Sequence, residues 1–247
     1  MTERTDSDIA LSVVIPAFNE ERRLPAYLDR VLAYLEGRSF SFEVVIVDDG
    51  SSDNTAAVVE RYAARDQRVR LVRLQRNRGK GGAVKTGMLS STGKLRLFTD
   101  ADGATPIAEV ERLKKAIEAG ADVAVGSRAL KDDALRVRTR FHRKFIGTVF
   151  NRIVRALTVK GINDTQCGFK LFTARAANAV FPLQNIEDFG FDVELLYICR
   201  KKGLPLAEVP VNWTDIPGTK VKLVRDSLRM LKDVVRIRLS DWRGEYK

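Results

Sequence analysis

Histidine and cysteine are nearly absent from this chain, and their scarcity limits the kinds of site that it can build. The 247 residues include one histidine, His142, and two cysteines, Cys167 and Cys199. Two cysteines are too few for a disulfide framework or a zinc site, and one histidine excludes His-based metal clusters and argues against Ser-His-Asp catalysis. Such cysteine usage fits a reducing, cytoplasmic compartment.

Long hydrophobic runs are also missing. No segment reaches the roughly eighteen uninterrupted apolar residues that a membrane-spanning helix needs, and residues 1–8 are polar, unlike the core of a signal peptide. We therefore expect no transmembrane segment, and a protein that is soluble or lies on a membrane surface.

Acidic residues are outnumbered, with 32 Asp and Glu against 43 Lys and Arg, for a net charge of +11. This excess favours an anionic partner, whether nucleic acid, acidic lipid or a phosphorylated substrate. Residues 134–160 contain no acid at all, and their basic residues are Arg136, Arg138, Arg140, Arg143, Lys144, Arg152, Arg155 and Lys160. We expect this basic stretch to face an anion.

The acids that matter most gather in two motifs about fifty residues apart. Residues 44–55 read Val-Val-Ile-Val-Asp-Asp-Gly-Ser-Ser-Asp-Asn-Thr, and residues 97–103 read Leu-Phe-Thr-Asp-Ala-Asp-Gly. Each apolar run is typical of a buried strand, which places Asp48, Asp49, Asp100 and Asp102 at strand ends on one edge of a sheet. Four carboxylates gathered there are costly unless a cation joins them, and the obvious one is a hard divalent ion that carries a phosphorylated ligand. The motifs indicate an enzyme that uses a nucleotide.

Strands alternate with helices through the first half of the chain. The pattern predicts strands over 11–16, 42–47, 69–74, 95–99 and 122–126, with helices over 21–36, after 53, over 82–90 and over 106–119. Such alternation specifies an α/β fold with a mainly parallel central sheet flanked by helices, in which ligands bind beyond the carboxyl ends of the strands. The second half is less regular, with a helix from about 191 to 203, a strand over 207–213 and a long helix from about 221.

Two short motifs each allow more than one interpretation. The glycine-rich segment 77–87 cannot be a Walker A loop, because alignment on Lys85 and Thr86 would need glycine where Val84 stands. It is either a turn that brings a helix N-terminus to a diphosphate or a structural turn. The Asp100-Ala-Asp-Gly-Ala-Thr105 segment resembles the signature of Asp-nucleophile phosphatases, but an alanine interrupts its Gly-Thr pair. The alternative is a metal bridge, with Asp102 as a direct ligand and Asp100 as a second ligand or ribose partner.

Together, four motifs resemble the family 2 glycosyltransferases, which have the GT-A fold. They are Val-Val-Ile-Pro-Ala-Phe-Asn-Glu at 13–20, the acidic run at 48–55, Asn-Arg-Gly-Lys-Gly at 77–81 and Asp-Ala-Asp at 100–102. Within that family, Asp-Thr-Gln-Cys-Gly-Phe-Lys-Leu-Phe at 164–172 and Trp-Thr-Asp-Ile-Pro-Gly-Thr-Lys at 213–220 resemble the dolichyl-phosphate β-glucosyltransferases more closely than the mannosyltransferases.

The resemblance implies a donor site for a sugar nucleotide. Its binding residues would be Pro16, Ala17, Phe18, Glu20, Asp48, Asp49, Lys80, Asp100, Ala101 and Asp102. Asp48 or Asp49 would read the base or ribose, and Asp102 with Asp100 would bind Mg²⁺ or Mn²⁺. Mannosyltransferase relatives have a glutamine two residues after the last aspartate, where this chain has Ala104. That departure argues against a third protein ligand for the metal and against the mannosyl branch.

The resemblance also implies a lipid-phosphate acceptor. The positions that match the acceptor residues are Arg128, Arg140 or Arg143, and Lys220, and a guanidinium fork suits phosphate oxygens. Asp164 would act near the acceptor, and with Asp102 it makes up the catalytic pair. Because a phosphate is already anionic near pH 7, Asp164 is either a base or an orienting group. Asp192 and Glu194 are weaker candidates that can simply pair with basic neighbours.

The C-terminal helix carries an apolar stripe at Val224, Leu228, Leu231, Val235, Leu239 and Trp242, with basic residues beside it at Arg225, Arg229, Lys232 and Arg236. The stripe either packs on the catalytic domain or lies in a membrane interface. We therefore expect a catalytic domain over 1–220 and a basic amphipathic helix over 221–247.

These features predict an inverting glycosyltransferase that moves glucose from UDP-glucose to a dolichyl or polyprenyl phosphate. It would act as a peripheral protein at the cytoplasmic face of the membrane, with no nucleic-acid partner. The alternatives are the same reaction with GDP-mannose or another sugar nucleotide, an Asp-nucleophile phosphatase, and a non-catalytic basic binding module.

Overall fold

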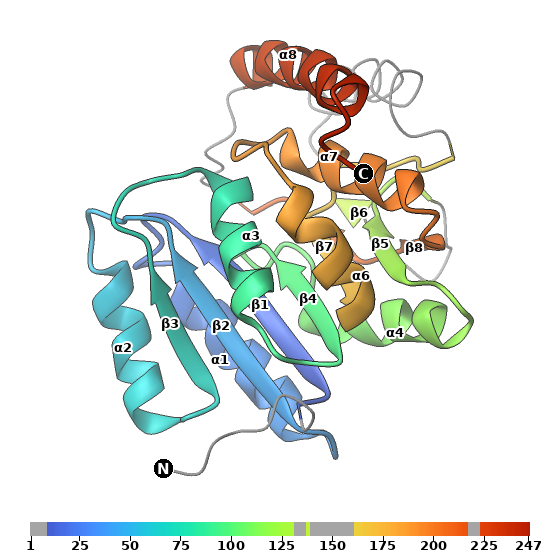
Figure 1. Cartoon of the computed structure of the whole chain (residues 1–247). Coiled ribbons are helices and arrows are strands. Elements are labelled where there is room, and N and C mark those ends of the chain that lie inside the picture. Colours follow the sequence, from blue (N-terminus) through green and yellow to red (C-terminus); the bar gives the residue numbers. More distant parts are fainter. Residues whose placement is uncertain (1–8, 131–136, 139–160, 217–222) are drawn as a thin grey trace.

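A seven-stranded sheet forms the centre of the computed structural model, which describes residues 9–130, 137–138, 161–216 and 223–247 (Figure 1). The strands lie in the order β3-β2-β1-β4-β7-β5-β8. Their bounds are β1 Leu11–Ala17, β2 Phe42–Asp48, β3 Val69–Arg73, β4 Leu95–Thr99, β5 Val123–Ser127, β7 Phe169–Thr173 and β8 Leu206–Pro210. Every neighbouring pair is parallel except the two that β7 makes, so the predicted mainly parallel sheet is confirmed.

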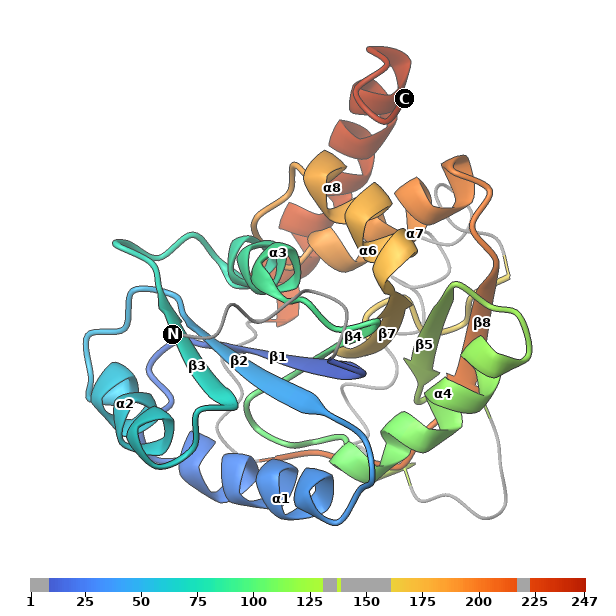
Figure 2. The same ribbon diagram turned by 60° about the horizontal axis from the view of Figure 1, so that its bottom comes forward.

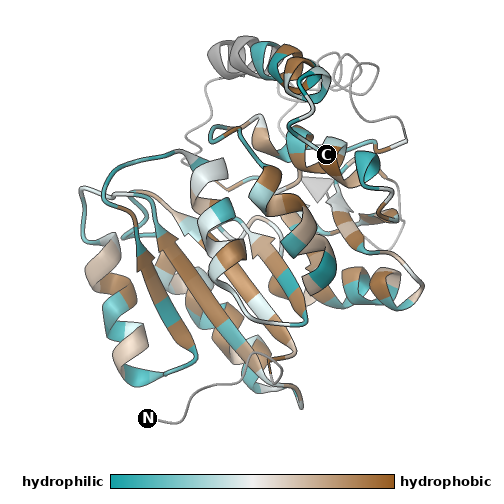
Figure 3. Ribbon diagram, in the orientation of Figure 1, coloured by the Kyte–Doolittle hydropathy of each residue, from teal (hydrophilic) through white to brown (hydrophobic). Residues whose placement is uncertain are grey.

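Helices cover both faces of this sheet (Figure 2). One face carries α1 Leu24–Glu36, α2 Thr55–Arg65 and α4 Val110–Glu118, and the other carries α3 Lys80–Ser90, α6 Ala174–Val180 and α7 Phe191–Lys201. Because successive strand residues point to opposite faces, β2 supplies Val44 and Ile46 to one core and Val45 and Val47 to the other. Burial on both faces explains why the central strands are almost continuously hydrophobic (Figure 3).

β7 is the reversed strand, and the sequence patterns did not predict it. It lies between β4 and β5 and runs antiparallel to both, with Phe169 opposite Thr99 at the carboxyl end of β4. A lysine, Lys170, interrupts its apolar run, which hides the strand from a hydrophobicity pattern. The reversal brings the turn that precedes β7 to the edge where the parallel strands end.

Several predicted boundaries move in the structure. α1 begins at Leu24 rather than at residue 21, because Pro25 favours a helix start and the preceding residues form a turn in which the Glu20 carboxylate binds Arg23. The helix predicted over 106–119 is a short 3₁₀ turn, η1 Ile107–Glu109, followed by α4. The strand predicted over 207–213 ends at Pro210, and β9 Trp213–Thr214 pairs with β6 Val137–Arg138 in a separate ribbon.

The long C-terminal helix is confirmed as α8 Leu223–Trp242. Over the part whose side chains are described, from Lys232 onward, it packs on α7 through Val234 and Ile237, and Tyr246 fills the same core. Hydrogen bonds reinforce the contact, since Tyr246 donates to Glu194 at 2.7 Å. Of the two alternatives for this helix, packing on the domain is correct for this face.

The predicted stripe, however, is not the face that packs. Val235, Leu239 and Trp242 are exposed, and Trp242 keeps 86% of its surface accessible. At 100° per residue these three positions lie roughly opposite Ile237, which is buried. Of the helices that the structure describes, none is both long enough and apolar enough to cross a bilayer.

Candidate active site

The two acidic motifs meet at one edge of the sheet. Asp48 closes β2 and Asp49 follows it, while Asp100 follows β4 directly, and the parallel register of β2, β1 and β4 sets these ends side by side. The turn 164–168 arrives at the same edge because β7 is reversed. The sequence prediction of one shared edge therefore holds, and β7 adds a segment that the prediction did not place there.

Asp48 and Asp49 sit in different surroundings. Both are buried, and the Asp49 carboxylate accepts hydrogen bonds from the backbone N–H groups of Arg78 at 2.7 Å and Gly79 at 2.9 Å. Burial, aided by the charge of Asp48, raises the pKa of Asp49 despite these bonds. The Oδ2 atom of Asp48 is buried without a hydrogen-bond partner among the described residues, and the Nε atom of Arg73 lies 3.6 Å away. Asp49 thus anchors the glycine-rich turn, while Asp48 keeps an acceptor atom available.

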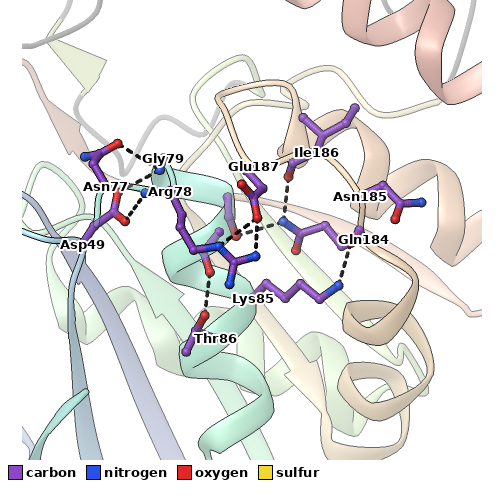
Figure 4. Close-up of polar contacts among 12 residues, drawn as sticks. Asp49, Asn77, Arg78, Gly79, Lys85, Thr86, Gln184, Asn185, Ile186 and Glu187 are labelled. Carbon is purple, nitrogen blue, oxygen red and sulfur yellow. Dashed lines mark hydrogen bonds and ion pairs between the residues drawn. The ribbon is translucent and has the colours of Figure 1, made fainter. Parts of the chain in front are cut away.

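The glycine-rich segment is a packing turn (Figure 4). A Cβ atom on Gly79 would lie 2.6 Å from the carbonyl oxygen of Glu187, and one on Gly81 would lie 2.7 Å from that of Ile186. Gly79 also has φ +88°, which favours glycine. The N–H of Gly82 donates to the Glu187 carbonyl at 3.1 Å. These glycines let the start of α3 touch the segment before α7, so the geometry favours the structural-turn alternative.

The first residue of α3 reaches the second acidic motif. The Nζ atom of Lys80 lies 2.5 Å from Oδ1 of Asp100. Although burial opposes its charged form, the carboxylates of Asp100 and Asp192 hold the pKa of Lys80 above its ordinary value. Asp102 accepts the N–H of Ala104 at 3.0 Å, and burial together with the charge of Asp100 raises the pKa of Asp102. Lys80 therefore partly offsets a site that is otherwise strongly anionic.

Asp100 and Asp102 fit a divalent ion only if other ligands join them. Carboxylate oxygens are the ligands that hard cations prefer, and the two acids stand two residues apart in one turn. In the described part of the chain, no group of three or more His, Cys, Asp or Glu side chains is placed to hold a metal. Phosphate oxygens commonly complete such a shell. The residues fit an ion that arrives with a diphosphate.

The loop after β1 is fixed by the loop after β2. The N–H of Asn19 donates to Ser51 at 2.9 Å, and the N–H of Glu20 donates to Thr55 at 2.8 Å. These serine and threonine side chains explain the polar run that follows Asp48 and Asp49. Among the predicted donor residues of this region, Pro16, Ala17 and Glu20 are buried and Phe18 is half-buried, and Ala101 is buried beside the second acidic motif. The Glu20 carboxylate is held by Arg23 at 2.7 Å.

Arg128 and Asp164 form a tight pair at the far side of the turn 164–168. The Nε and Nη2 atoms of Arg128 donate to the two oxygens of Asp164 at 2.7 and 2.8 Å, and the backbone N–H of Arg128 donates at 2.9 Å. Burial by itself would raise the pKa of Asp164, but the charge and hydrogen bonds of Arg128 bring it below its ordinary value. The guanidinium also lies 5.5 Å from the centre of the Trp213 ring. The two residues act as one unit.

Comparison with known proteins identifies the family. Residues 12–181 match the model for glycosyl transferase family 2. The chain belongs to that family. Curated relatives named dolichyl-phosphate beta-glucosyltransferase include those of Dictyostelium discoideum, 44% identical over 97% of this chain and 77% of the relative, and Homo sapiens, 44% identical over 96% and 77%. The protein of Saccharomyces cerevisiae is 37% identical over 98% and 78%.

Solved structures with the same fold support this placement. Glucosyl-3-phosphoglycerate synthase from Mycobacterium tuberculosis, in complex with Mn²⁺, UDP and glucosyl-3-phosphoglycerate, superposes with a TM-score of 0.65 at 18% identity, over 94% of this chain and 79% of that one. Mannosyl-3-phosphoglycerate synthase from Rubrobacter xylanophilus gives 0.68 at 18% identity, over 96% and 75%. The family 2 chain is therefore a glycosyltransferase with the GT-A fold.

Not every predicted site residue of this glycosyltransferase can be placed. Arg140, Arg143 and Lys220, like most of the basic stretch 134–160, lie outside the described residues. Asp192 pairs with Lys170, as expected for an acid with a basic neighbour. Glu194 instead accepts backbone N–H groups from the segment before α7 and the hydroxyl of Tyr246, which makes it structural.

The sequence patterns missed two residues of this site, Gly168 and Lys170. A Cβ atom on Gly168 would lie 2.2 Å from Oδ2 of Asp100, so the glycine packs directly on that carboxylate. Lys170 is fully buried beneath the turn. The available signal was a lysine inside the apolar run Phe-Lys-Leu-Phe, because a charged residue in a buried strand needs a partner.

Proposed function

We propose that this glycosyltransferase moves glucose from UDP-glucose to a dolichyl or other polyprenyl phosphate, with inversion at the anomeric carbon. The reaction would take place at the cytoplasmic face of a membrane, to which the protein is peripherally bound. Relatives 37 to 45% identical over nearly the whole chain carry the name dolichyl-phosphate beta-glucosyltransferase, which supports both the sugar and the acceptor.

The observation that carries the proposal is the meeting of two oppositely equipped groups across one turn. Asp100 touches Gly168 at the end of the turn 164–168, and Asp164 at its start holds Arg128. The acidic group suits a metal-bound diphosphate, and the guanidinium suits the phosphate of an acceptor. Donor and acceptor phosphates would thus be bound on opposite sides of a single five-residue segment.

Positioning and charge neutralisation account for the chemistry that these residues can supply. A divalent ion held by Asp102 and Asp100 would supply positive charge to the departing UDP. Lys80 stands beside Asp100 and can reach the same phosphates. On the acceptor side, Arg128 orients a phosphate oxygen for attack on the anomeric carbon from the face opposite the leaving group. Holding both partners in line supplies much of the rate enhancement.

Asp164 serves this reaction as an orienting group. Arg128 occupies both of its carboxylate oxygens, and its pKa is lowered, which makes it a weak proton acceptor. A phosphate acceptor needs no deprotonation near pH 7. Of the two roles that the sequence left open, the pairing supports orientation of Arg128 over base catalysis.

The nucleotide base is the point on which the main alternative differs. The unpartnered Oδ2 of Asp48 suits a donor N–H from a base, and both uracil and guanine carry one. The GDP-mannose alternative therefore stays open, although the relatives' names favour glucose. Family membership removes the phosphatase and the non-catalytic module.

Thermal denaturation with single nucleotides tests the proposed donor. UDP and UDP-glucose should raise the Tm only when Mn²⁺ or Mg²⁺ is present, whereas GDP and GDP-mannose should not. A ligand at 100 times its Kd adds about 2.7 kcal/mol, which is easily detected. Preferential stabilisation by GDP would move the assignment to a mannosyl donor, and no shift with any nucleotide would refute a sugar-nucleotide donor.

We further propose that residues 1–220 form the catalytic domain and that α8 attaches it to the membrane. The exposed Val235, Leu239 and Trp242 form an apolar strip along the outer side of the helix. Exposed basic side chains flank the strip, with Lys232, Arg236 and Arg243 on one side and Arg238 on the other. An apolar strip between basic flanks suits the interface of a membrane that contains anionic lipid.

Replacing the apolar strip with serine should abolish this attachment. Val235→Ser, Leu239→Ser and Trp242→Ser combined should lower binding to vesicles of phosphatidylcholine and phosphatidylserine about 100-fold, since half-burying three such side chains contributes about 3 kcal/mol. Cosedimentation measures the loss. Leu89→Ser, which alters an exposed leucine at the end of α3, is the matched control. Equal binding of the triple variant and the wild type would exclude the helix as the attachment site.

A further inference from the structure

Lys170 is a buried cation in the middle of the sheet. Its side chain is fully inaccessible, and its Nζ atom donates to the carbonyl oxygen of Cys167 at 2.7 Å and forms an ion pair with Asp192. The same atom lies 5.2 Å from the centre of the Phe98 ring. Every hydrogen of the ammonium group thus faces a carbonyl, a carboxylate or an aromatic face.

Fold stability does not require such a pair. Removing two charges from water is costly, and a well-packed apolar pair in the same place is often as stable or more so. What an apolar side chain at position 170 cannot do is hold the carbonyl of Cys167. The geometry therefore points to the turn above Lys170 as the reason for its charge.

That carbonyl belongs to the peptide that joins Cys167 to Gly168. A Cβ atom on Gly168 would lie 2.2 Å from Oδ2 and 2.6 Å from Oδ1 of Asp100, so the glycine backbone forms a wall against the carboxylate. Fixing the Cys167 carbonyl from below fixes where this wall stands. The position of the Asp100 carboxylate depends on it.

The other side of Asp100 is bounded by Lys80, and the same buried acid acts there. Lys80 lies 2.5 Å from Asp100, and the charge of Asp192 also raises the pKa of Lys80. The contacts close a ring from Asp100 through Lys80, Asp192 and Lys170 to the Cys167–Gly168 peptide and back to Asp100. We call these residues the Asp100 clamp.

We propose that Lys170, with Asp192, is a positioning residue that holds the turn 164–168 so that Asp100 meets the metal and nucleotide correctly. The turn begins at Asp164, which binds Arg128, and ends at Gly168, which bounds Asp100. One anchored segment thereby sets the spacing between the two halves of the site. The inference rests on the proposed role of Asp100 at the donor site.

Two substitutions test the clamp in different ways. Lys170→Met removes the tie to the Cys167 carbonyl at similar volume, and Gly168→Ala pushes the Asp100 carboxylate while leaving the buried charges in place. In isothermal titration, both should weaken Mn²⁺-dependent UDP binding at least tenfold and leave metal-free UDP binding unchanged. In turnover assays, Lys170→Met should lower kcat more than it raises the KM for the lipid phosphate.

Lys85→Met is the matched control, because Lys85 also donates to backbone carbonyls, those of Pro182 and Gln184, but far from Asp100. It should change the Tm without changing Mn²⁺-dependent binding. If Lys170→Met does not fold, Gly168→Ala decides the question. Wild-type Mn²⁺–UDP affinity in a folded variant of either kind would overturn the clamp, whereas a wild-type protein that binds no Mn²⁺–UDP would instead refute the donor site itself.

Discussion

Asp102→Asn should lower turnover about 10²- to 10³-fold without unfolding the protein. Asparagine keeps the oxygen that accepts the N–H of Ala104, so the local turn is retained, but it loses the charge that holds a divalent ion. Such an ion contributes several kcal/mol to stabilising a departing diphosphate, and each 1.36 kcal/mol is a factor of ten in rate. Initial rates measured over a Mn²⁺ titration, beside the urea unfolding curve, give both quantities.

Asp122→Asn is the control for this variant. Asp122 also stands at a strand end, but at the opposite edge of the sheet, where it accepts a hydrogen bond from Thr173 and pairs with Arg175. Its substitution should leave turnover and the Mn²⁺ requirement as in the wild type. Near-normal turnover in Asp102→Asn would remove Asp102 from the metal site.

Arg128→Leu should affect both the acceptor and the fold. Loss of the guanidinium should reduce kcat/KM for the lipid phosphate about 10³-fold while Mn²⁺-dependent UDP binding stays the same, because charge-assisted contacts to the acceptor are lost and the donor side is untouched. The substitution also leaves Asp164 buried without its partner, which costs about 3–5 kcal/mol of stability. Lipid-acceptor kinetics and urea unfolding measure the two effects.

The stability loss should depend on pH in a defined direction. In the wild type the pKa of Asp164 is lowered, so its stabilising effect is complete above the unfolded-state value of about 3.9 and is lost only as the pH falls through the folded-state value. Without Arg128, burial disfavours the carboxylate, and a protonated Asp164 needs no cation. The difference between wild type and Arg128→Leu should therefore be largest near neutral pH and shrink toward pH 4.

Arg175→Leu provides the comparison for the acceptor pair. Arg175 also pairs with an aspartate, Asp122, but its side chain is 71% exposed. Its removal should cost less than about 1 kcal/mol and leave acceptor kinetics unchanged. An Arg128→Leu variant that retains wild-type acceptor kinetics would rule out Arg128 as the phosphate-binding residue.

The sequence predicted the donor edge well because that edge is encoded locally. An apolar run followed at once by acids places those acids at a strand end, and parallel strands bring their ends together, so Asp48 and Asp100 could be placed from the motifs themselves. The helix α3 and the strands of the first half follow from the same periodicity. Only their boundaries moved.

The acceptor side and the clamp depend on pairings that no local pattern contains. Asp164 meets Arg128 across 36 residues, and Lys170 meets Asp192 across 22. β7 is short, and the lysine that breaks its apolar pattern is explained only by an acid on α7. The outward direction of the strip on α8 was hidden for a similar reason, since packing chose Val234 and Ile237 over the more regular apolar stripe.

The reversed direction of β7 bears on how acceptor preference can diversify among enzymes of this fold. β5 and β4 end at the same edge, and β7 begins there, so the chain between Ser127 and Phe169 leaves and re-enters the sheet at one place. A segment with such neighbouring ends can be lengthened or exchanged without reordering the strands. The fold is therefore modular, with a constant nucleotide half and a replaceable acceptor insert whose last turn must still leave Asp100 the space that Gly168 provides.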